Sequence, residues 1–402
     1  MRELKKITVN LKAENALKSG HPWVYAEEVV SREDGIENGD IVDVYSHKNR
    51  YLGSGFYNDN SKILVRVFSK NPNDKFDYDF FKRRISYAVN YRRSVMGEDF
   101  SACRLVFGDS DGLPGFIADR FENVIVTQIM CLGIEKRKED LFRALVEVMS
   151  EAGEKISAVY ERNDVAVREK EGLTQGKGLA YGELFGDGHV KITENGVIYD
   201  VDYVNGQKTG FFLDQKYNRL TAAKVAKGKN VLDCFTHTGS FALNCAKAGA
   251  KSVTAVDISA DAVNESRLNA SLNGIDNIDF ICMDVFDYLE RLYENGRCPF
   301  DFIILDPPAF TKSRETVKNA YRGYKEINLK AMRLLKRGSF LATASCSHFM
   351  TDELFRKMLF DAANDAGVSV KIAQSRAAAP DHPEMLGIPE TKYLKFYLVQ
   401  IV

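Results

Sequence analysis

At 402 residues, with 45% hydrophobic and 28% charged side chains, the chain is long enough for roughly two or three domains of a globular protein. Its formal net charge of −1 gives no whole-surface attraction for nucleic acid, so any such binding must use local basic patches. No apolar run approaches the roughly 20 residues that span a bilayer, and the first residues lack the apolar stretch of a signal peptide. We therefore expect a cytoplasmic protein without membrane association.

Residues 1–72 read as short β-type runs separated by turn signals. The runs lie at 41–45, 51–57 and 63–68, and Asp-Gly and Asn-Gly pairs precede them. They predict a small β-rich domain, followed by a linker near residues 71–74.

Residues 75–189 mix the two kinds of pattern. A helical pattern covers about 76–96, a second one covers about 135–151, and β-type runs lie at 103–107, 124–130 and 158–161. This order predicts a compact α+β middle domain.

The first helix of that domain carries aromatic and basic residues together. Phe80, Tyr87 and Tyr91 fall near one predicted face, and Arg83 and Arg92 fall on others. Two interpretations remain open: a solvated charged face over an aromatic packing stripe, or a patch that faces RNA.

From residue 190 to 402 the pattern becomes regular. Apolar runs at 231–232, 252–256, 278–282, 302–305 and 340–344 alternate with helical segments, which is typical of a parallel sheet covered on both faces. Two further runs, at 368–372 and 393–399, have no long helix between them. They predict an antiparallel pair that completes a seven-stranded, Rossmann-like α/β sheet.

The first strand-to-helix loop of this sheet, residues 232–241, is the expected ligand site, because open α/β sheets bind ligands beyond the carboxyl ends of their strands. Gly239 is its one glycine, where a dinucleotide fingerprint has three, so NAD and FAD are disfavoured. Phe235, Thr236 and Gly239 are candidate cofactor contacts.

Acidic residues end three consecutive predicted strands. Asp233 can hold an ammonium group, and Asp257, with Ile258 beside it, can accept hydrogen bonds from ribose hydroxyls. Asp284 is placed to meet an adenine amino group, with Val285 against the ring. Each aspartate alone is more commonly a turn or N-cap residue, but the ordered series favours a nucleoside that carries an amino acid and no phosphate. S-adenosylmethionine is that molecule.

A carboxylate and a thiol follow the next two predicted strands. Asp306 opens Asp306-Pro307-Pro308, and Cys346 lies between two serines. A thiolate that adds to C6 of cytosine makes C5 nucleophilic, and a carboxyl on N3 or the exocyclic amine stabilises the charge that develops. A buried thiol chosen for packing is the plain alternative for Cys346, and its place at a strand end beside Asp306 favours catalysis.

The remaining cysteines suggest no other chemistry. The chain has seven, scattered, with no Cys-x-x-Cys pair and no nearby histidine couple. Reduced thiols are expected, and neither a disulfide framework nor a metal site is predicted.

The whole chain resembles the three-domain class I methyltransferases that form 5-methylcytosine in large-subunit ribosomal RNA. The segments that carry the likeness are His21-Pro-Trp-Val-Tyr25, Gly112-Leu-Pro-Gly-Phe-Ile-Ala-Asp-Arg120, Tyr160-Glu-Arg-Asn-Asp164, Gln207-Lys-Thr-Gly-Phe-Phe-Leu-Asp-Gln215, Asp306-Pro-Pro308, Tyr321-Arg-Gly-Tyr-Lys325 and Ser345-Cys-Ser347. The resemblance implies that residues 1–72 form a PUA-type RNA-binding domain and that residues 190–402 form the methyltransferase domain. It also implies that Phe212 and Gln215 belong to the cofactor pocket.

One departure concerns the Asp306 loop. The two-cysteine RNA cytosine methyltransferases place a cysteine just after the proline of this loop, whereas here Pro308 is followed by Ala309. The base that removes the C5 proton is therefore unassigned.

An RNA substrate would need cations around the site, because phosphate contacts supply much of the affinity. The candidates are Lys5, Lys6, Lys12, Arg83, Arg92, Arg322 and Lys325. For residues 321–325, substrate contact and ordinary packing are equally open.

Other functions stay open at this point. An RNA guanine or adenine N-methyltransferase could use the Asp306 loop without Cys346, and a non-catalytic RNA-binding assembly factor could retain the same fold. A small-molecule methyltransferase should not need residues 1–190. Whether the chain forms a homodimer is undetermined.

Overall fold

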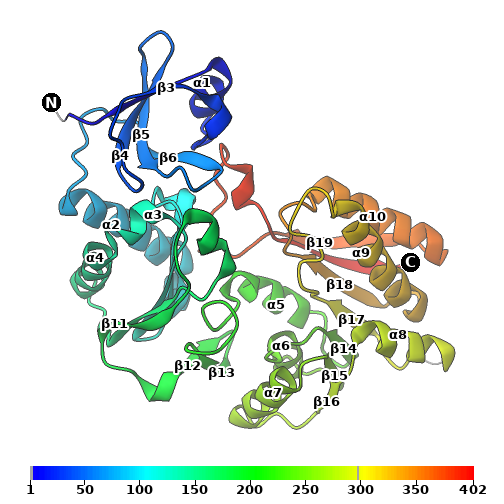
Figure 1. Cartoon of the computed structure of the whole chain (residues 1–402). Helices are drawn as coiled ribbons and strands as arrows, with labels where there is room; N and C mark the ends of the chain where they lie inside the picture. Colours follow the sequence, from blue (N-terminus) through cyan, green and yellow to red (C-terminus); the bar gives the residue numbers. More distant parts are fainter. Residues whose placement is uncertain (1–2, 297) are drawn as a thin grey trace. The chain divides into compact units, whose positions relative to one another are not determined.

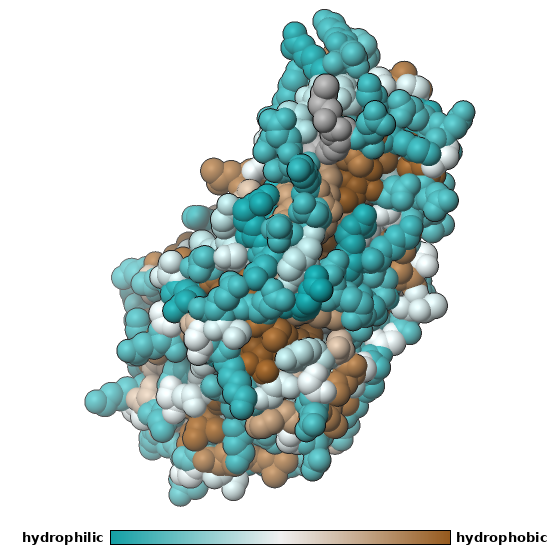
Figure 2. Space-filling model, turned by 90° about the vertical axis from the view of Figure 1, so that its left-hand side faces the viewer, coloured by the Kyte–Doolittle hydropathy of each residue, from teal (hydrophilic) through white to brown (hydrophobic). Residues whose placement is uncertain are grey.

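The computed structural model describes residues 3–296 and 298–402 (Figure 1). By its internal packing the chain divides into two compact units. The first contains residues 1–192, 201–213 and 380–391, and the second contains residues 193–200, 214–379 and 392–402. None of the described helices combines the length and the apolar character needed to cross a membrane. On the face drawn in Figure 2, hydrophilic side chains predominate and hydrophobic ones form separate patches.

The N-terminal part of the first unit is a six-stranded sheet in the order β2-β6-β5-β4-β1-β3. Its elements are β1 (Lys6–Val9), α1 (Leu11–Lys18), β2 (Trp23–Tyr25), β3 (Val29–Arg32), β4 (Ile41–Ser46), β5 (Tyr51–Tyr57) and β6 (Ile63–Ser69), with a 3₁₀ turn, η1 (Ala26–Glu28). The three predicted strands are β4, β5 and β6. The sequence patterns missed β1, β2 and β3, because runs of three or four residues are too short to show a period of two.

A five-stranded sheet in the order β11-β10-β9-β8-β7 follows, with helices beside it. The elements are α2 (Tyr78–Met96), β7 (Ala102–Phe107), β8 (Phe116–Phe121), β9 (Val124–Ile129), α3 (Leu132–Glu135), α4 (Lys138–Glu151), β10 (Ala158–Arg162) and β11 (Lys177–Gly182). Short 3₁₀ turns are η2 (Gly97–Ser101), η3 (Gly108–Asp111), η4 (Ala166–Glu171) and η5 (Gly186–Gly188). The two predicted helices are α2 and α4, and the three predicted strands are β7, β9 and β10. Strands β8 and β11 were not predicted.

The aromatic stripe expected on α2 is only partly a packing face. Phe80 is buried, but Tyr87 and Tyr91 are exposed, 61% and 39% respectively. The buried face instead runs through Ile85 and Arg92. Of the three aromatic residues that the packing interpretation placed on one face, only Phe80 is therefore buried.

The second unit contains a seven-stranded sheet in the order β16-β15-β14-β17-β18-β20-β19. A hairpin, β12 (His189–Glu194) and β13 (Val197–Asp202), and the turn η6 (Leu213–Gln215) precede it. The sheet and its helices are α5 (Lys216–Ala223), β14 (Asn230–Cys234), α6 (Ser240–Lys247), β15 (Ser252–Asp257), α7 (Ala260–Leu272), β16 (Ile278–Cys282), α8 (Val285–Glu294), β17 (Phe302–Leu305), α9 (Val317–Leu334), β18 (Phe340–Ser345), α10 (Asp352–Ala366), β19 (Val370–Arg376) and β20 (Lys395–Ile401), with η7 (Pro389–Thr391) before the last strand.

Strands β14 to β18 are parallel, and β20 runs antiparallel to both β18 and β19. The predicted α/β sheet with an antiparallel C-terminal pair is therefore confirmed. This order is that of a class I methyltransferase, with the first strand, β14, in the middle.

Two cores cover the faces of this sheet. Ile303 and Leu341 pack with α9 and α10, whereas their neighbours Phe302 and Ala342 pack with α5 and α6. Successive strand residues point to opposite faces, so a strand covered on both sides must be apolar at every position. This is why these strands read as continuous apolar runs.

Candidate active site

The carboxyl ends of five adjacent parallel strands bring the predicted site residues to one edge of the sheet. Asp233 pairs with Ala255 across β14 and β15, and Asp257 ends β15 opposite Cys282 of β16. On the other side, Leu305 of β17 lies beside Thr343 of β18, so Asp306 and Cys346 follow neighbouring strand ends. The predicted site residues of these five strands therefore share one edge of the sheet.

The Asp233 carboxylate is buried and half-satisfied. Its Oδ2 accepts hydrogen bonds from the Thr236 hydroxyl at 2.6 Å and from the Ala242 amide at 2.9 Å. Its Oδ1 is buried with no hydrogen-bond partner. Burial, with Asp306 and Asp257 nearby, raises the pKa of Asp233 to about 7. An unsatisfied buried carboxylate oxygen fits an ammonium group, as expected for the amino-acid end of the predicted cofactor.

The loop after β14 is held in an uncommon conformation. Phe235 and His237 have φ angles of 62° and 50°, and Gly239 has 79°. A side chain at Gly239 would come within 3.1 Å of the Ser266 Cβ, so the turn also needs glycine for space. Non-glycine residues at positive φ cost free energy and cluster at ligand-binding turns.

Asp257 organises this loop through both oxygens. Its Oδ2 accepts the His237 amide and its Oδ1 accepts the Ser259 amide, each at 2.9 Å. Beside it, Ile258 exposes 68% of its side chain, an apolar surface at the strand end that suits a flat ring. The carboxylate already accepts hydrogen bonds from two amides, and its oxygens can also accept hydrogen bonds from ribose hydroxyls.

Asp284 serves as the N-cap of α8. Its Oδ1 accepts the amides of Phe286 at 2.7 Å and Asp287 at 3.3 Å, and Val285 is buried behind it. The capping role that such a residue commonly has is therefore present. These bonds use one carboxylate oxygen, and the side chain lies at the end of β16, where the adenine contact was predicted.

Asp306 is bonded to Gln215, one of the residues implied by the resemblance. The Gln215 Nε2 donates to Asp306 Oδ1 at 2.9 Å, and the Asn218 Nδ2 donates to Gln215 Oε1 at 2.7 Å. This chain of amides fixes the orientation of the carboxyl. Phe212 lies in the first unit, where the Lys208 ammonium is 4.3 Å from the centre of its ring.

Cys346 differs in burial from most of the other cysteines. Cys103, Cys131, Cys234 and Cys245 are buried, whereas Cys346 is half-buried. Burial raises the pKa of Cys131 to about 11 and that of Cys234 well above its usual value. A raised pKa makes these buried thiols poor nucleophiles, because the thiolate is the reactive form.

Two further side chains lie around Cys346. The Ser345 hydroxyl donates to the Tyr324 hydroxyl at 3.0 Å, and Tyr324 is fully buried. Lys395 is 2% exposed and donates to the carbonyl of Ser347. Sequence reasoning passed over Lys395, although a lysine inside an apolar terminal strand was a visible signal of something unusual.

Two side chains of the segment 321–325, for which substrate contact and packing were equally open, make packing contacts. Tyr321 donates to Asp361 at 2.5 Å, and Lys325 forms an ion pair with Asp365 at 2.7 Å. Both partners are on α10, so these side chains tie two helices together. Arg322 is exposed.

Arg92 is a correction among the predicted RNA contacts. It is fully buried, its guanidinium pairs with Asp111 at 2.5 Å, and it donates to the carbonyls of Arg104 and Asp381. A side chain with every donor directed inward cannot reach a phosphate. The exposed candidates, besides Arg322, are Lys5, Lys6, Lys12 and Arg83.

Arg92→Lys should therefore lower the free energy of unfolding by about 2 kcal/mol, because an ammonium cannot replace the fork of a buried guanidinium. Arg83→Lys, on the same helix but exposed, is the matched control and should change it by less than about 0.5 kcal/mol. Urea denaturation followed by circular dichroism measures both. Equal stability of the two variants would contradict this assignment of Arg92.

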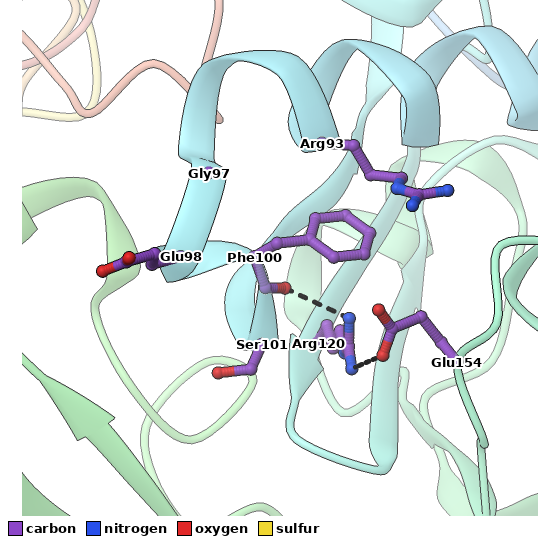
Figure 3. A pocket seen from close by; sticks show the side chains of 7 residues that line it. All are labelled: Arg93, Gly97, Glu98, Phe100, Ser101, Arg120 and Glu154. Carbon is purple, nitrogen blue, oxygen red and sulfur yellow. Dashed lines mark hydrogen bonds and ion pairs between the residues drawn. The ribbon is translucent and has the colours of Figure 1, made fainter.

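A pocket of about 350 Å³ lies in the first unit (Figure 3). Arg120 lines it and is held by Glu154 at 2.6 Å and by the carbonyl of Phe100. Arg93 and Glu98 also line it, and we assign the pocket no role in the chemistry.

Comparison with known proteins adds to this geometry. Residues 7–70 match the model of a PUA-like domain, and residues 181–395 match the model of an S-adenosylmethionine-dependent methyltransferase. Proteins named ribosomal RNA large subunit methyltransferase I are similar over the whole length. The one from Pseudoalteromonas atlantica is 41% identical and covers 99% of each chain, and the one from Vibrio vulnificus is 40% identical and covers 97% of each.

Solved structures support the fold. The crystal structure of a methyltransferase complexed with SAH has a TM-score of 0.84 at 22% identity, covering 98% of this chain and 99% of that one. A methyltransferase from Streptococcus mutans has a TM-score of 0.83 at the same identity and coverage.

Proposed function

The chain belongs to the ribosomal RNA large subunit methyltransferase I family, and from that premise we propose that it forms 5-methylcytosine in large-subunit ribosomal RNA through a thiolate adduct of Cys346. The observation that carries this proposal is the placement of Cys346 and Asp306 at neighbouring strand ends, beside the acidic series of a cofactor site. The names of the relatives support large-subunit ribosomal RNA as the substrate. The presence of Cys346 supports C5 of cytosine as the methylated atom.

Asp233, Asp257 and Asp284 are the proposed holders of the cofactor, together with Phe235, Thr236, Gly239, Ile258, Val285 and Gln215 of the same unit. For Phe212, a cofactor contact is what the family resemblance implies. The buried, unsatisfied Oδ1 of Asp233 is the feature that most directly suits a cationic amino acid. Bound S-adenosylmethionine supplies an electrophilic methyl group for C5 of the base.

In the proposed reaction the Cys346 thiolate adds to C6 of an extruded cytosine, forming a carbon–sulfur bond and placing negative charge on the ring. The Asp306 carboxyl, in its protonated form, donates its proton to N3 and so neutralises that charge, and its hydrogen bond from Gln215 keeps it oriented. After C5 carries the methyl group, a base removes the C5 proton, and the electron pair expels the thiolate. The ring regains its aromaticity and Cys346 is regenerated.

The base for the last step lies outside the Asp306 loop, because Ala309 stands where the two-cysteine enzymes have their second thiol. His348, two residues after Cys346, has a buried Nδ1 with no hydrogen-bond partner. It is the most suitable acceptor near the thiol in the described part of the chain.

The domain division that goes with this function is a PUA-type domain at residues 1–72, a middle domain at 75–189 and the methyltransferase domain at 190–402. Lys5, Lys6, Lys12 and Arg83 are the proposed phosphate contacts of the N-terminal regions, with Arg322 in the methyltransferase domain. Such contacts make RNA binding weaken as salt is raised. We propose that the reaction takes place in the cytoplasm.

Nucleoside mass spectrometry tests the proposed product. Large-subunit ribosomal RNA from cells that lack the gene is incubated with purified protein and S-adenosylmethionine bearing a labelled methyl group. We expect one labelled 5-methylcytidine. A labelled methylguanosine or methyladenosine would instead show N-methylation by the Asp306 loop, and no label at all would favour a non-catalytic assembly factor.

A further inference from the structure

The last strand of the sheet begins with a buried lysine. Lys395 opens β20, faces Ser345 across the antiparallel pair with β18, and is 2% exposed. Every other residue of β20 except Gln400 is apolar. A lysine is rarely buried to this extent unless another group compensates its charge.

The contacts of Lys395 surround the proposed nucleophile. Its Nζ donates to the carbonyl of Ser347 and to that of Tyr393, the latter at 2.7 Å. Ser345 and Ser347 flank Cys346. Ser345 pairs with Lys395 across the two strands, and the carbonyl of Ser347 accepts a hydrogen bond from the Lys395 ammonium. Lys395 therefore fixes the backbone on both sides of Cys346.

The ammonium has no carboxylate as an ion-pair partner among residues 3–296 and 298–402. Burial lowers the pKa of Lys395 to about 8, while the charges of Cys346 and Asp352 act in the opposite direction. Asp352, on α10, is itself occupied by the Tyr397 hydroxyl, which donates to its Oδ1 at 2.5 Å. Of the two negative groups that act on Lys395, Cys346 has the larger effect, and it is the one that takes part in the proposed reaction.

We propose that Lys395 is a positioning residue whose buried ammonium is the counter-cation of the Cys346 thiolate. This rests on the proposed function for the identity of the nucleophile. The ammonium stabilises the thiolate after its proton has left to solvent, and it receives the same charge again when the thiolate is expelled from C6. A cation and a thiolate in one buried environment titrate as a coupled pair.

A purely structural role is the competing explanation, and the choice of variant separates the two. Lys395→Gln retains a hydrogen-bond donor toward the two carbonyls but has no charge. Lys395→Arg retains the donor and the positive charge. Lys371→Gln, on the exposed neighbouring strand β19, is the matched control for loss of a lysine.

The test is the pH dependence of Cys346 alkylation by iodoacetamide, followed on the Cys346 peptide by mass spectrometry in the full-length protein. We expect alkylation at pH 7 to be about tenfold slower in Lys395→Gln, with the midpoint shifted up by about one pH unit, and to be near the wild-type rate in Lys395→Arg and Lys371→Gln. An unchanged profile in Lys395→Gln would overturn the proposal.

A second measurement needs no variant, in case Lys395→Gln does not fold. In the wild type, the alkylation midpoint of Cys346 should lie at least one pH unit below that of Cys298, the other half-buried cysteine, whose pKa is raised by burial. Equal midpoints would also overturn the proposal. Labelled 5-methylcytidine formed by Cys346→Ala would refute the proposed function alone, because the alkylation profiles do not depend on turnover.

Discussion

Cys346→Ala should lower the single-turnover rate of cytosine methylation at least ten-thousandfold, which corresponds to about 5.5 kcal/mol of lost transition-state stabilisation. The reason is that C5 of cytosine is a poor nucleophile until a group has added to C6. Cys346→Ser should be almost as inactive, because a hydroxyl of ordinary pKa ionises far less readily than a thiol. The affinity for the cofactor should stay within about twofold of the wild-type value, because the half-buried Cys346 is not one of the residues proposed to hold the cofactor.

Single-turnover incubation with large-subunit ribosomal RNA, quenched and measured as labelled 5-methylcytidine, gives these rates. Cys298→Ala is the matched control, because it removes another half-buried thiol, and it should react at the wild-type rate. RNA transcribed with 5-fluorocytidine should form a denaturation-stable adduct with wild type and none with Cys346→Ala, because fluorine at C5 prevents release. A variant without Cys346 that still forms 5-methylcytidine would refute the adduct mechanism.

Asp233→Asn should weaken the binding of S-adenosylmethionine several-hundredfold, or about 3–4 kcal/mol, by removing the charge opposite its ammonium. In the wild type, affinity should rise about tenfold per pH unit from pH 5.5 toward 7, because the Asp233 carboxyl has a pKa of about 7 and must lose its proton to pair with a cation. The variant should show no such dependence. Isothermal titration calorimetry across this range measures both, with the exposed Asp279→Asn of β16 as control.

The same carboxyl predicts an effect on stability with the opposite sign. Its pKa is about 7 in the folded chain, against 3.8 ordinarily, so the folded state binds more protons between those values. Stability without cofactor is therefore lost as the pH rises from 3.8 toward 7, by an amount on the order of 4 kcal/mol. Asp233→Asn should melt at a higher temperature than wild type at pH 8. A lower melting temperature would show that the carboxylate is compensated by groups other than the cofactor.

Some of the site could be predicted from the sequence because strand ends are readable in it. Apolar runs alternating with helices place Asp233, Asp257 and Asp284 after consecutive strands, and parallel strands of one sheet end at one edge. Asp306 and Cys346 follow the next two strands, so the same argument places them at neighbouring strand ends. These positions can be predicted because, within each of these two sets, strands that follow one another in the sequence lie side by side in the sheet.

Contacts that depend on burial or on a distant strand could not be predicted in this way. Arg92 seemed a phosphate contact because helical charge is usually solvated, and only the packing around α2 shows that it bonds Asp111 in the interior. Lys395 lies near Cys346 because β20 returns antiparallel beside β18, a pairing across about fifty residues of sequence.

Local periodicity and residue type are enough to predict the α/β order of the methyltransferase sheet, the acidic strand ends and the cysteine. Only the packing of the folded chain shows that Asp233 has an unsatisfied oxygen, that Arg92 is internal and that an ammonium lies beside the thiol-bearing segment. The physical reason is that desolvation is a property of the surroundings, and those surroundings are assembled from segments far apart in the chain.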